Sequence, residues 1–257
     1  MSKIGIQLYS VWKEAEKDFL GTIQKVASLG YESIQFAGFY HTPSDAVKQL
    51  LAEKEMVVAG AHVGIQQLLH DELEKMFEYH QAIGNNLIIC PSLPKEMRET
   101  ADDYKKTAET LNQIGEACKK AGFVFGYHNH DFEFATFGDQ TGFDLLFNET
   151  APDLVKMELD CYWASFAGHD PLEIITTYKE RVVSLHMKDM KIVNGKKMGT
   201  EIGKGQLDFD SLIKEGKKFG VEWFTVEQEE FEGDPFESLA VNVDALKQLV
   251  SKCSSWR

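Results

Sequence analysis

Four residues that could bind one divalent metal ion stand at the ends of four separate apolar segments. His128 closes FVFGYH, Asp160 closes LVKMELD, His186 closes RVVSLH and Glu227 closes WFTVE. Any one of them alone would more often be a hydrogen-bonding residue at the end of a strand. The carboxyl ends of the strands of a parallel barrel converge on one face, so four such residues together predict a shared metal site.

The donor types indicate which ion this site would hold. Two imidazoles and two carboxylates suit Mn²⁺, Zn²⁺ or Fe²⁺ better than Ca²⁺, because calcium prefers oxygen ligands. We expect one divalent ion, Mn²⁺ or Zn²⁺, and Co²⁺, Fe²⁺ and Mg²⁺ are also compatible. Two carboxylates would balance the charge of the ion, which leaves more positive charge for substrate oxygens than three would.

Two further histidines could transfer protons. His130 lies in YHNHDFEF, either on the same strand face as His128 or on a loop above the metal. It could act as an acid or base near neutral pH, although a surface-loop histidine would explain it equally well. Glu133 in the same segment is a weaker candidate. His62 ends MVVAGAH and could bind a substrate hydroxyl or carry a proton.

Other polar and aromatic residues near strand ends could bind a substrate. Trp12 and Trp163 follow the first and sixth apolar segments, where an indole ring could pack against a sugar or belong to the core. Lys188 and Asp189 follow His186 directly. Lys188 is a substrate-binding candidate, but a solvated ion pair with Asp189 at the rim is the more common arrangement.

The segments that would position these residues follow a recurrent pattern of an amphipathic helix, often a glycine, and a short apolar strand. DFLGTIQKVASLG precedes YESIQFAG, with Gly30 placed as a helix C-terminal cap. Eight apolar segments separated by helical patterns predict parallel strands covered by helices. The 257 residues suit one (β/α)8 barrel, an α/β fold that we expect to span residues 1–257 as a single domain. An open doubly wound sheet is the alternative.

The glycine-rich stretch 190–206 (MKIVNGKKMGTEIGKGQ) follows a strand end, and we predict a loop over the site. Gly203 and Gly205 could form a phosphate-binding turn. Because no GK[ST] signature accompanies them, a tight turn that closes the loop is favoured.

The composition of the chain limits the classes of molecule that the protein is expected to bind. The net charge of −14 disfavours nucleic acid, which usually binds a basic surface. No apolar run reaches the length of a membrane span, no signal-peptide pattern opens the chain, and the four cysteines form no CxxC pair. We therefore expect a cytoplasmic protein that binds a small sugar or polyol and neither nucleic acid nor membrane. A homo-oligomer is compatible with these features.

Several of these segments resemble the xylose-isomerase-like TIM-barrel superfamily of sugar isomerases, epimerases and inosose dehydratases. The similar segments are IGIQLYS, LGYESIQFAGFY, MELDCYWASFAG, VSLHMKD, IGKGQLDF and FTVEQE. The resemblance implies metal-ligand roles for Asp160, His186 and Glu227. It also places Gln35, a substrate-binding candidate, where a glutamate is common. Many members have a glutamate at the end of strand five, where this chain has His128.

These residues and the resemblance together predict a metal-dependent sugar isomerase or epimerase. We expect Glu227 to remove a proton next to a carbonyl, giving an enediolate stabilised by the metal, with His130 or His62 as the opposing acid or base. The same intermediate could expel a β-oxygen, so a lyase or dehydratase acting on a keto-sugar or keto-polyol is the main alternative. A metal-dependent phosphodiesterase or endonuclease and a non-catalytic sugar-binding barrel are less favoured.

Overall fold

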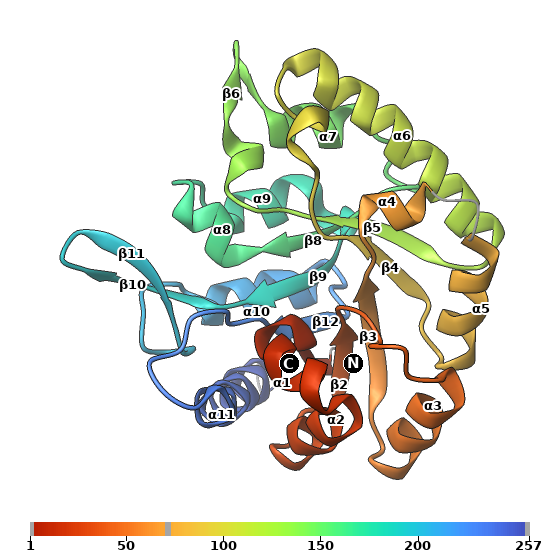
Figure 1. The fold of residues 1–257 in the computed structure, drawn as a ribbon. Helices are drawn as coiled ribbons and strands as arrows, with labels where there is room; N and C mark the ends of the chain where they lie inside the picture. The colour runs from red at the N-terminus through yellow and green to blue at the C-terminus, as the bar shows by residue number, and fades with distance from the viewer. Residues whose placement is uncertain (1–2, 70–72, 255–257) are drawn as a thin grey trace.

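A closed barrel of eight parallel strands forms the centre of the structure, a computed structural model that describes residues 3–69 and 73–254. The strands follow one another around the barrel in chain order, and the last pairs with the first (Figure 1). This closure confirms the predicted barrel and excludes the open sheet. The strands are β1 (Lys3–Gln7), β2 (Ser33–Phe36), β3 (Val57–His62), β4 (Leu87–Cys90), β5 (Val124–His128), β8 (Lys156–Asp160), β9 (Val182–Met187) and β12 (Trp223–Val226).

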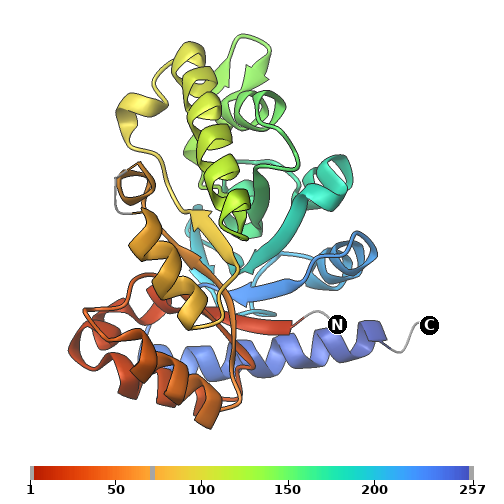
Figure 2. The same cartoon turned by 90° about the vertical axis from the view of Figure 1, so that its right-hand side faces the viewer.

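Helices surround the barrel, as Figures 1 and 2 show from two directions. The longer helices are α2 (Phe19–Ser28), α3 (Ser44–Glu53), α5 (Leu73–Ala82), α6 (Ala101–Lys120), α7 (Gly142–Glu149), α9 (Pro171–Tyr178), α10 (Phe209–Lys218) and α11 (Pro235–Ser254). The shorter ones are α1 (Trp12–Lys17), α4 (Ile65–Leu68) and α8 (Cys161–Phe166), with 3-10 turns η1 (Leu8–Val11), η2 (Lys95–Met97), η3 (Phe132–Phe134) and η4 (Lys179–Arg181).

Local sequence explains where helix α6 begins and which face it buries. The Thr100 hydroxyl accepts a hydrogen bond from the Asp103 backbone N–H at 3.1 Å, and the Asp103 carboxylate accepts one from the Thr100 N–H at 3.0 Å. This reciprocal pair satisfies two backbone donors that the first helical turn would otherwise leave unpaired. Tyr104, Ala108 and Leu111 then recur at helical spacing and are fully buried. Capping and periodicity together fix this helix against the barrel.

The strand register brings the predicted ligands level with one another. Asp160 of β8 is opposite His186 of β9, and His186 is opposite Thr225 of β12, two residues before Glu227. On the other side, His128 of β5 is paired with Glu158 of β8. The carboxyl ends of these strands therefore meet at one end of the barrel, as the sequence pattern predicts.

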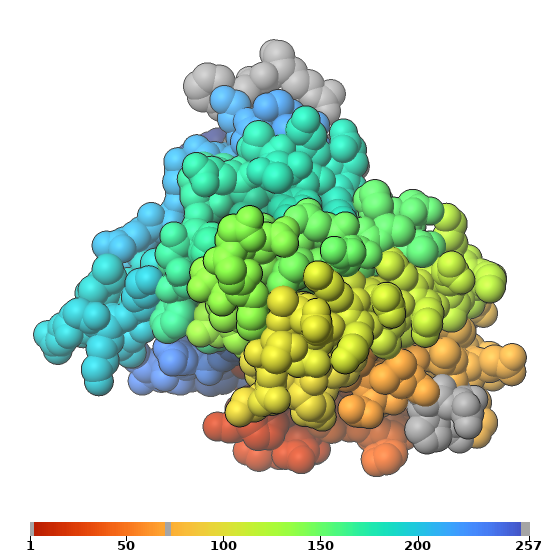
Figure 3. Space-filling view, turned by 90° about the horizontal axis from the view of Figure 1, so that it is seen from above, coloured from red at the N-terminus to blue at the C-terminus, as the bar shows by residue number. Residues whose placement is uncertain are grey.

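Residues 189–200 correct the prediction of a loop over the site. They form an antiparallel hairpin of β10 (Asp189–Val193) and β11 (Lys196–Thr200), which projects away from the barrel in Figures 1 and 3. Asn194 and Gly195 turn the chain with φ of 51° and 77°. Asn-Gly between two strands is a strong hairpin signal, because both residues adopt positive φ readily. A second hairpin joins β6 (Thr136–Phe137) to β7 (Gln140–Thr141).

After the β10–β11 hairpin the chain forms a tight turn at Gly203 and Gly205, as predicted. The Asp189 carboxylate accepts backbone N–H groups of Gly203, Gly205 and Leu207 at 2.9, 2.8 and 3.1 Å. A carboxylate of the chain itself thus occupies the position that a phosphate would need. Gly30, the predicted C-terminal cap, has a φ of 95° just after α2.

Two bulk properties can be checked in the described residues. Within residues 3–69 and 73–254, no helix combines the length and the apolar character needed to cross a bilayer. Cys90, Cys118 and Cys161 are free and buried, whereas the side chain of Cys253 lies outside the described part of the chain.

Candidate metal centre

The structure brings the four predicted ligands together. One donor atom from each of them lies within 4.8 Å of the donor atoms of the other three. All four residues are buried, none being more than 4% exposed. Each comes from the carboxyl end of a different strand, as predicted: His128, Asp160, His186 and Glu227.

A fifth residue, Glu158, lies at the centre of the cluster and was missed by the sequence analysis. It is fully buried, and its Oε1 lies 2.7 Å from Nε2 of His62, 2.9 Å from Nε2 of His186 and 3.3 Å from Nδ1 of His128. A charged residue in the apolar strand LVKMELD was the available signal. Because it stands two residues before Asp160, alternation turns both side chains to the same strand face.

Gln35 has a different place from the one expected. It is fully buried, and its Oε1 accepts a hydrogen bond from Nε2 of Gln7 at 2.7 Å and lies 2.8 Å from Nε2 of His186. Its Nε2 donates to Oε2 of Glu158 at 2.5 Å. The amide is therefore engaged by Gln7, Glu158 and His186.

The structure offers two overlapping groups of metal donors. One consists of His128, Asp160, His186 and Glu227, and the other of His62, His128, Glu158 and His186. Both Glu158 oxygens already face protein donors. In contrast, Oδ2 of Asp160 is buried without a hydrogen-bond partner, as is Nδ1 of His128. A buried carboxylate oxygen without a partner is costly unless a cation satisfies it, so the residues fit a divalent ion on the Asp160 side.

The charges of the cluster also favour a cation. Burial alone would lower the pKa of His186, but Glu158 and Glu227 outweigh it and hold this pKa well above the usual value. Burial raises the pKa of Asp160 to about 7, against the opposing effect of Lys188. The cluster contains three buried carboxyl groups, those of Glu158, Asp160 and Glu227, whereas the sequence analysis counted two. A divalent ion would compensate this excess of negative charge.

The loop that follows β5 carries His130 to the edge of the cluster. Its ring centroid lies 5.0 Å from that of His128 and 5.7 Å from that of Trp163, and its Nδ1 is buried without a hydrogen-bond partner. Burial lowers the pKa of His130 to about 4. Glu133 supports this loop, because its Oε2 accepts the His130 backbone N–H at 2.8 Å and its Oε1 accepts the Tyr127 hydroxyl.

Lys188 does not form the predicted ion pair with Asp189. It is 3% exposed, and its Nζ lies 2.5 Å from Oε2 of Glu229 and 4.7 Å from the ring centroid of Trp163. The physical reason is that the backbone N–H groups of Gly203 and Gly205, in the turn after the hairpin, already satisfy the Asp189 carboxylate. Trp163 flanks the same side of the centre, with its Nε1 buried and without a partner.

The remaining candidates border the centre. His62 lines a cavity of about 750 Å³ that opens beside the cluster, together with Phe39 and Tyr79. Trp12 is 41% exposed and lies on the rim of the barrel, in a separate small pocket. The structure therefore places His62 at the cluster itself, whereas Trp12 lines a different pocket.

Glu158→Gln should weaken metal binding by roughly 10–100-fold, the usual effect of losing a carboxylate that orients histidine ligands. Glutamine keeps the shape but loses the negative charge, and its NH2 group cannot accept the hydrogen bond that Gln35 donates to Oε2. Equilibrium dialysis with Zn²⁺ would measure this, with the exposed Glu180→Gln as the matched control. Complete loss of the ion would instead place Glu158 among the direct ligands.

Comparison with known proteins adds three findings. The family model described as xylose isomerase-like TIM barrel matches residues 23–249. An inosose dehydratase of Clostridium tetani (strain Massachusetts / E88) is 26% identical to this chain over 255 residues, and the match covers 84% of each chain. An inosose dehydratase of Lacticaseibacillus casei is 24% identical over 263 residues, and the match covers 86% of each chain. The crystal structure of a sugar phosphate isomerase/epimerase from Parabacteroides distasonis ATCC 8503 has a TM-score of 0.78 and 26% identity, covering 98% of this chain and 96% of that one.

Proposed function

The chain belongs to the xylose isomerase-like TIM barrel family, and on this premise we propose a metal-dependent enzyme that removes a proton next to a carbonyl of a sugar or polyol. The observation that carries the proposal is the buried group of His128, Asp160, His186 and Glu227, with the unpartnered Oδ2 of Asp160 among them. Four ionisable residues would not remain so close in a purely structural core, where apolar packing is at least as stable.

These four residues are the proposed ligands of one Mn²⁺ or Zn²⁺ ion. When bound, such an ion supplies positive charge beside the substrate oxygen that becomes negative during proton removal. The chain provides the orientation of the ligands. Oε1 of Glu158 faces Nε2 of His186, while Nδ1 of His186 faces Oε2 of Glu227 at 2.8 Å. Glu158 would therefore hold the ring through Nε2, while Nδ1, on the side of the proposed ligand Glu227, would be the nitrogen that faces the ion.

Proton transfer is assigned to groups that border the ligands. His130 is the better candidate for the group that opposes Glu227, because its Nδ1 has no partner and its low pKa keeps the ring neutral at pH 7. A neutral imidazole can accept a proton directly. His62 is the second candidate, but its Nε2 is engaged by Oε1 of Glu158 at 2.7 Å. The unpartnered Nε1–H of Trp163 could donate to a substrate oxygen.

Two outcomes can follow the common first step. Returning the proton to carbon gives isomerisation or epimerisation, the activity in the name of the Parabacteroides relative. Loss of a β-oxygen gives a dehydratase, the activity in the names of the curated relatives. His128 stands where many members have glutamate, so the chain lacks the glutamate at the end of strand five that could serve two-sided proton transfer. That substitution favours the lyase as a full second candidate beside the isomerase or epimerase.

Exchange of carbon-bound hydrogen in D₂O is the test of this proposal. Zn²⁺-loaded protein incubated with a panel of keto-sugars and keto-polyols should introduce deuterium next to the carbonyl, and NMR would detect it. Protein treated with a chelator should lose the exchange and regain it when Zn²⁺ is restored. The product then separates the candidates, because an unsaturated sugar identifies the lyase and a stereoisomer or aldose–ketose pair identifies the isomerase.

Absence of metal-dependent exchange across the panel would overturn proton removal and leave a sugar-binding barrel. More than one tightly bound ion per chain would favour the phosphodiesterase alternative, which needs additional metals. Metal content per chain, exchange and the identity of the product together separate all four candidate functions.

A further inference from the structure

A small pocket on the rim of the barrel has no role in the reaction proposed above. It lies between the turn and helix α1 that follow β1 and the loop that follows β12, the strand paired with β1. Its volume is about 280 Å³. We call it the rim pocket and define it by Tyr9, Trp12, Lys13, Glu14, Glu229 and Phe231.

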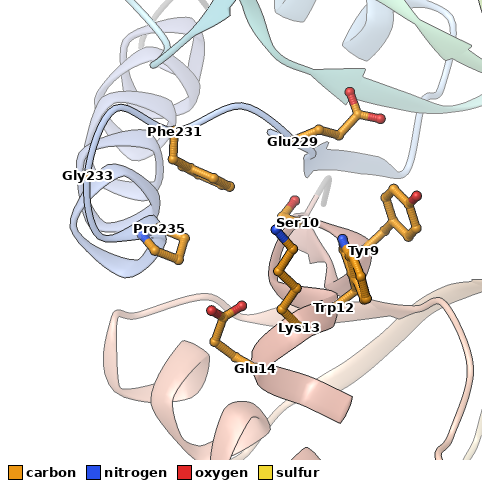
Figure 4. A pocket seen from close by; sticks show the side chains of 9 residues that line it. All are labelled: Tyr9, Ser10, Trp12, Lys13, Glu14, Glu229, Phe231, Gly233 and Pro235. Atoms are coloured by element: carbon orange, nitrogen blue, oxygen red, sulfur yellow. The ribbon is translucent and has the colours of Figure 1, made fainter. Parts of the chain in front are cut away.

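Exposed aromatic rings gather at this pocket. Tyr9 is 47% exposed and Trp12 41%, and the neighbouring Tyr40, 37% exposed, donates its hydroxyl to the Trp12 carbonyl at 3.3 Å. Figure 4 shows Tyr9 and Trp12 on one side of the hollow and Phe231 on the other. Grouped exposed aromatics mark a binding surface more often than isolated ones do. Their electron-rich faces attract the weakly positive C–H groups of a sugar ring.

Polar side chains between the rings would meet hydroxyl groups. Lys13 supplies donors, and Glu14 and Glu229 supply acceptors. The charged residues of the lining are thus one lysine and two glutamates, a set that would repel rather than attract a phosphate. The lining suits an uncharged ring with several hydroxyls, and its small volume suits a single ring.

The rim pocket is connected to the metal centre. Glu229 stands two residues after the proposed ligand Glu227, and its Oε2 lies 2.5 Å from Nζ of Lys188. Lys188 in turn lies against the ring of Trp163, which flanks His130. The lining of the rim pocket is therefore linked, through Lys188 and Trp163, to a group that borders the metal centre.

We propose that the rim pocket binds a second, uncharged sugar unit, joined to the unit held at the metal centre. This inference rests on the proposed function and narrows its substrate class. The substrate would be an unphosphorylated glycoside of two units rather than a single sugar phosphate. Trp12 then acts as a specificity-determining residue, because only two-unit substrates reach its ring.

Binding measured by saturation-transfer NMR on Zn²⁺-loaded protein tests this proposal. The probes are glucose, glucose 6-phosphate, cellobiose, maltose and lactose. We expect at least one disaccharide to bind about tenfold tighter than glucose, which corresponds to about 1.4 kcal/mol. Glucose 6-phosphate should bind no tighter than glucose. Trp12→Ala should abolish most of the preference for the disaccharide.

Val124→Ala is the matched control, since Val124 is also 41% exposed but begins β5 at the opposite end of the barrel. It should keep the preference, and equal metal content in both variants would show that the fold is intact. A preference that survives Trp12→Ala, or disaccharides that bind no better than glucose, would overturn the inference. If keto-sugars or keto-glycosides still exchange deuterium, the proposed function stands without the inference; if neither exchanges, both are overturned.

Discussion

His186→Ala is expected to remove the metal ion from the protein and to lower the rate of proton exchange by at least ~10³-fold. His186 is fully buried, with Nδ1 2.8 Å from Glu227 and Nε2 2.9 Å from Glu158. Its loss would take away one proposed ligand and leave two buried carboxylates facing a cavity. The effect on metal affinity should exceed the ~10–100-fold that loss of an outer partner causes.

Metal content after desalting, measured by mass spectrometry, checks this result. Asp160→Ala should behave in the same way, because its unpartnered Oδ2 is the donor that most needs a cation. His169→Ala is the matched control: His169 is exposed, and its ring stacks on Phe134 at 4.5 Å, outside the cluster. Should both cluster variants retain one ion per chain, the ligand assignment is wrong.

His130→Gln should lower the exchange rate by ~10²–10⁴-fold while the metal remains bound. Glutamine retains polarity and approximate size but cannot accept a proton at neutral pH. His130 lies at the edge of the cluster with a free Nδ1, so its replacement leaves the four proposed ligands in place. The combination of lost exchange and retained metal separates a proton-transfer role from a ligand role.

His62→Gln provides the comparison for His130→Gln. Because Nε2 of His62 is engaged by Glu158, we expect a smaller loss of exchange and a weaker hold on the metal. The opposite ranking of the two variants would assign proton transfer to His62. Full activity in both would leave Glu227 without an opposing group and contradict the proposed mechanism.

Inosose dehydratases and a sugar phosphate isomerase/epimerase are similar to this chain at about one quarter identity, and the proposed proton removal is a step from which either kind of product could form. What differs between such activities is the fate of the intermediate. We expect that fate to depend on groups that border the proposed ligands, such as His130 and Trp163. The proposed experiments therefore concentrate on these groups.

The amino-acid sequence determined the barrel and the level at which the ligands lie. Helical periodicity, capping residues and apolar strands are local properties, so all eight strands could be located before the structure was known. A residue that ends a parallel strand must lie at the carboxyl face of the barrel, which is why His128, Asp160, His186 and Glu227 could be grouped. The hairpin at Asn194–Gly195 was equally local, and its turn signal was overlooked.

Only the tertiary structure decided which polar atoms meet. Glu158 contacts three histidines from three other strands, and Lys188 pairs with Glu229, 41 residues away. Gln35 is a buried hydrogen-bond partner of Glu158, a contact that the sequence analysis did not predict for the same reason. Barrel closure sets these distances, and electrostatic and hydrogen-bond energies vary steeply over a few ångströms. Strand patterns fix the level of a side chain along the barrel, but only closure fixes its neighbours across it.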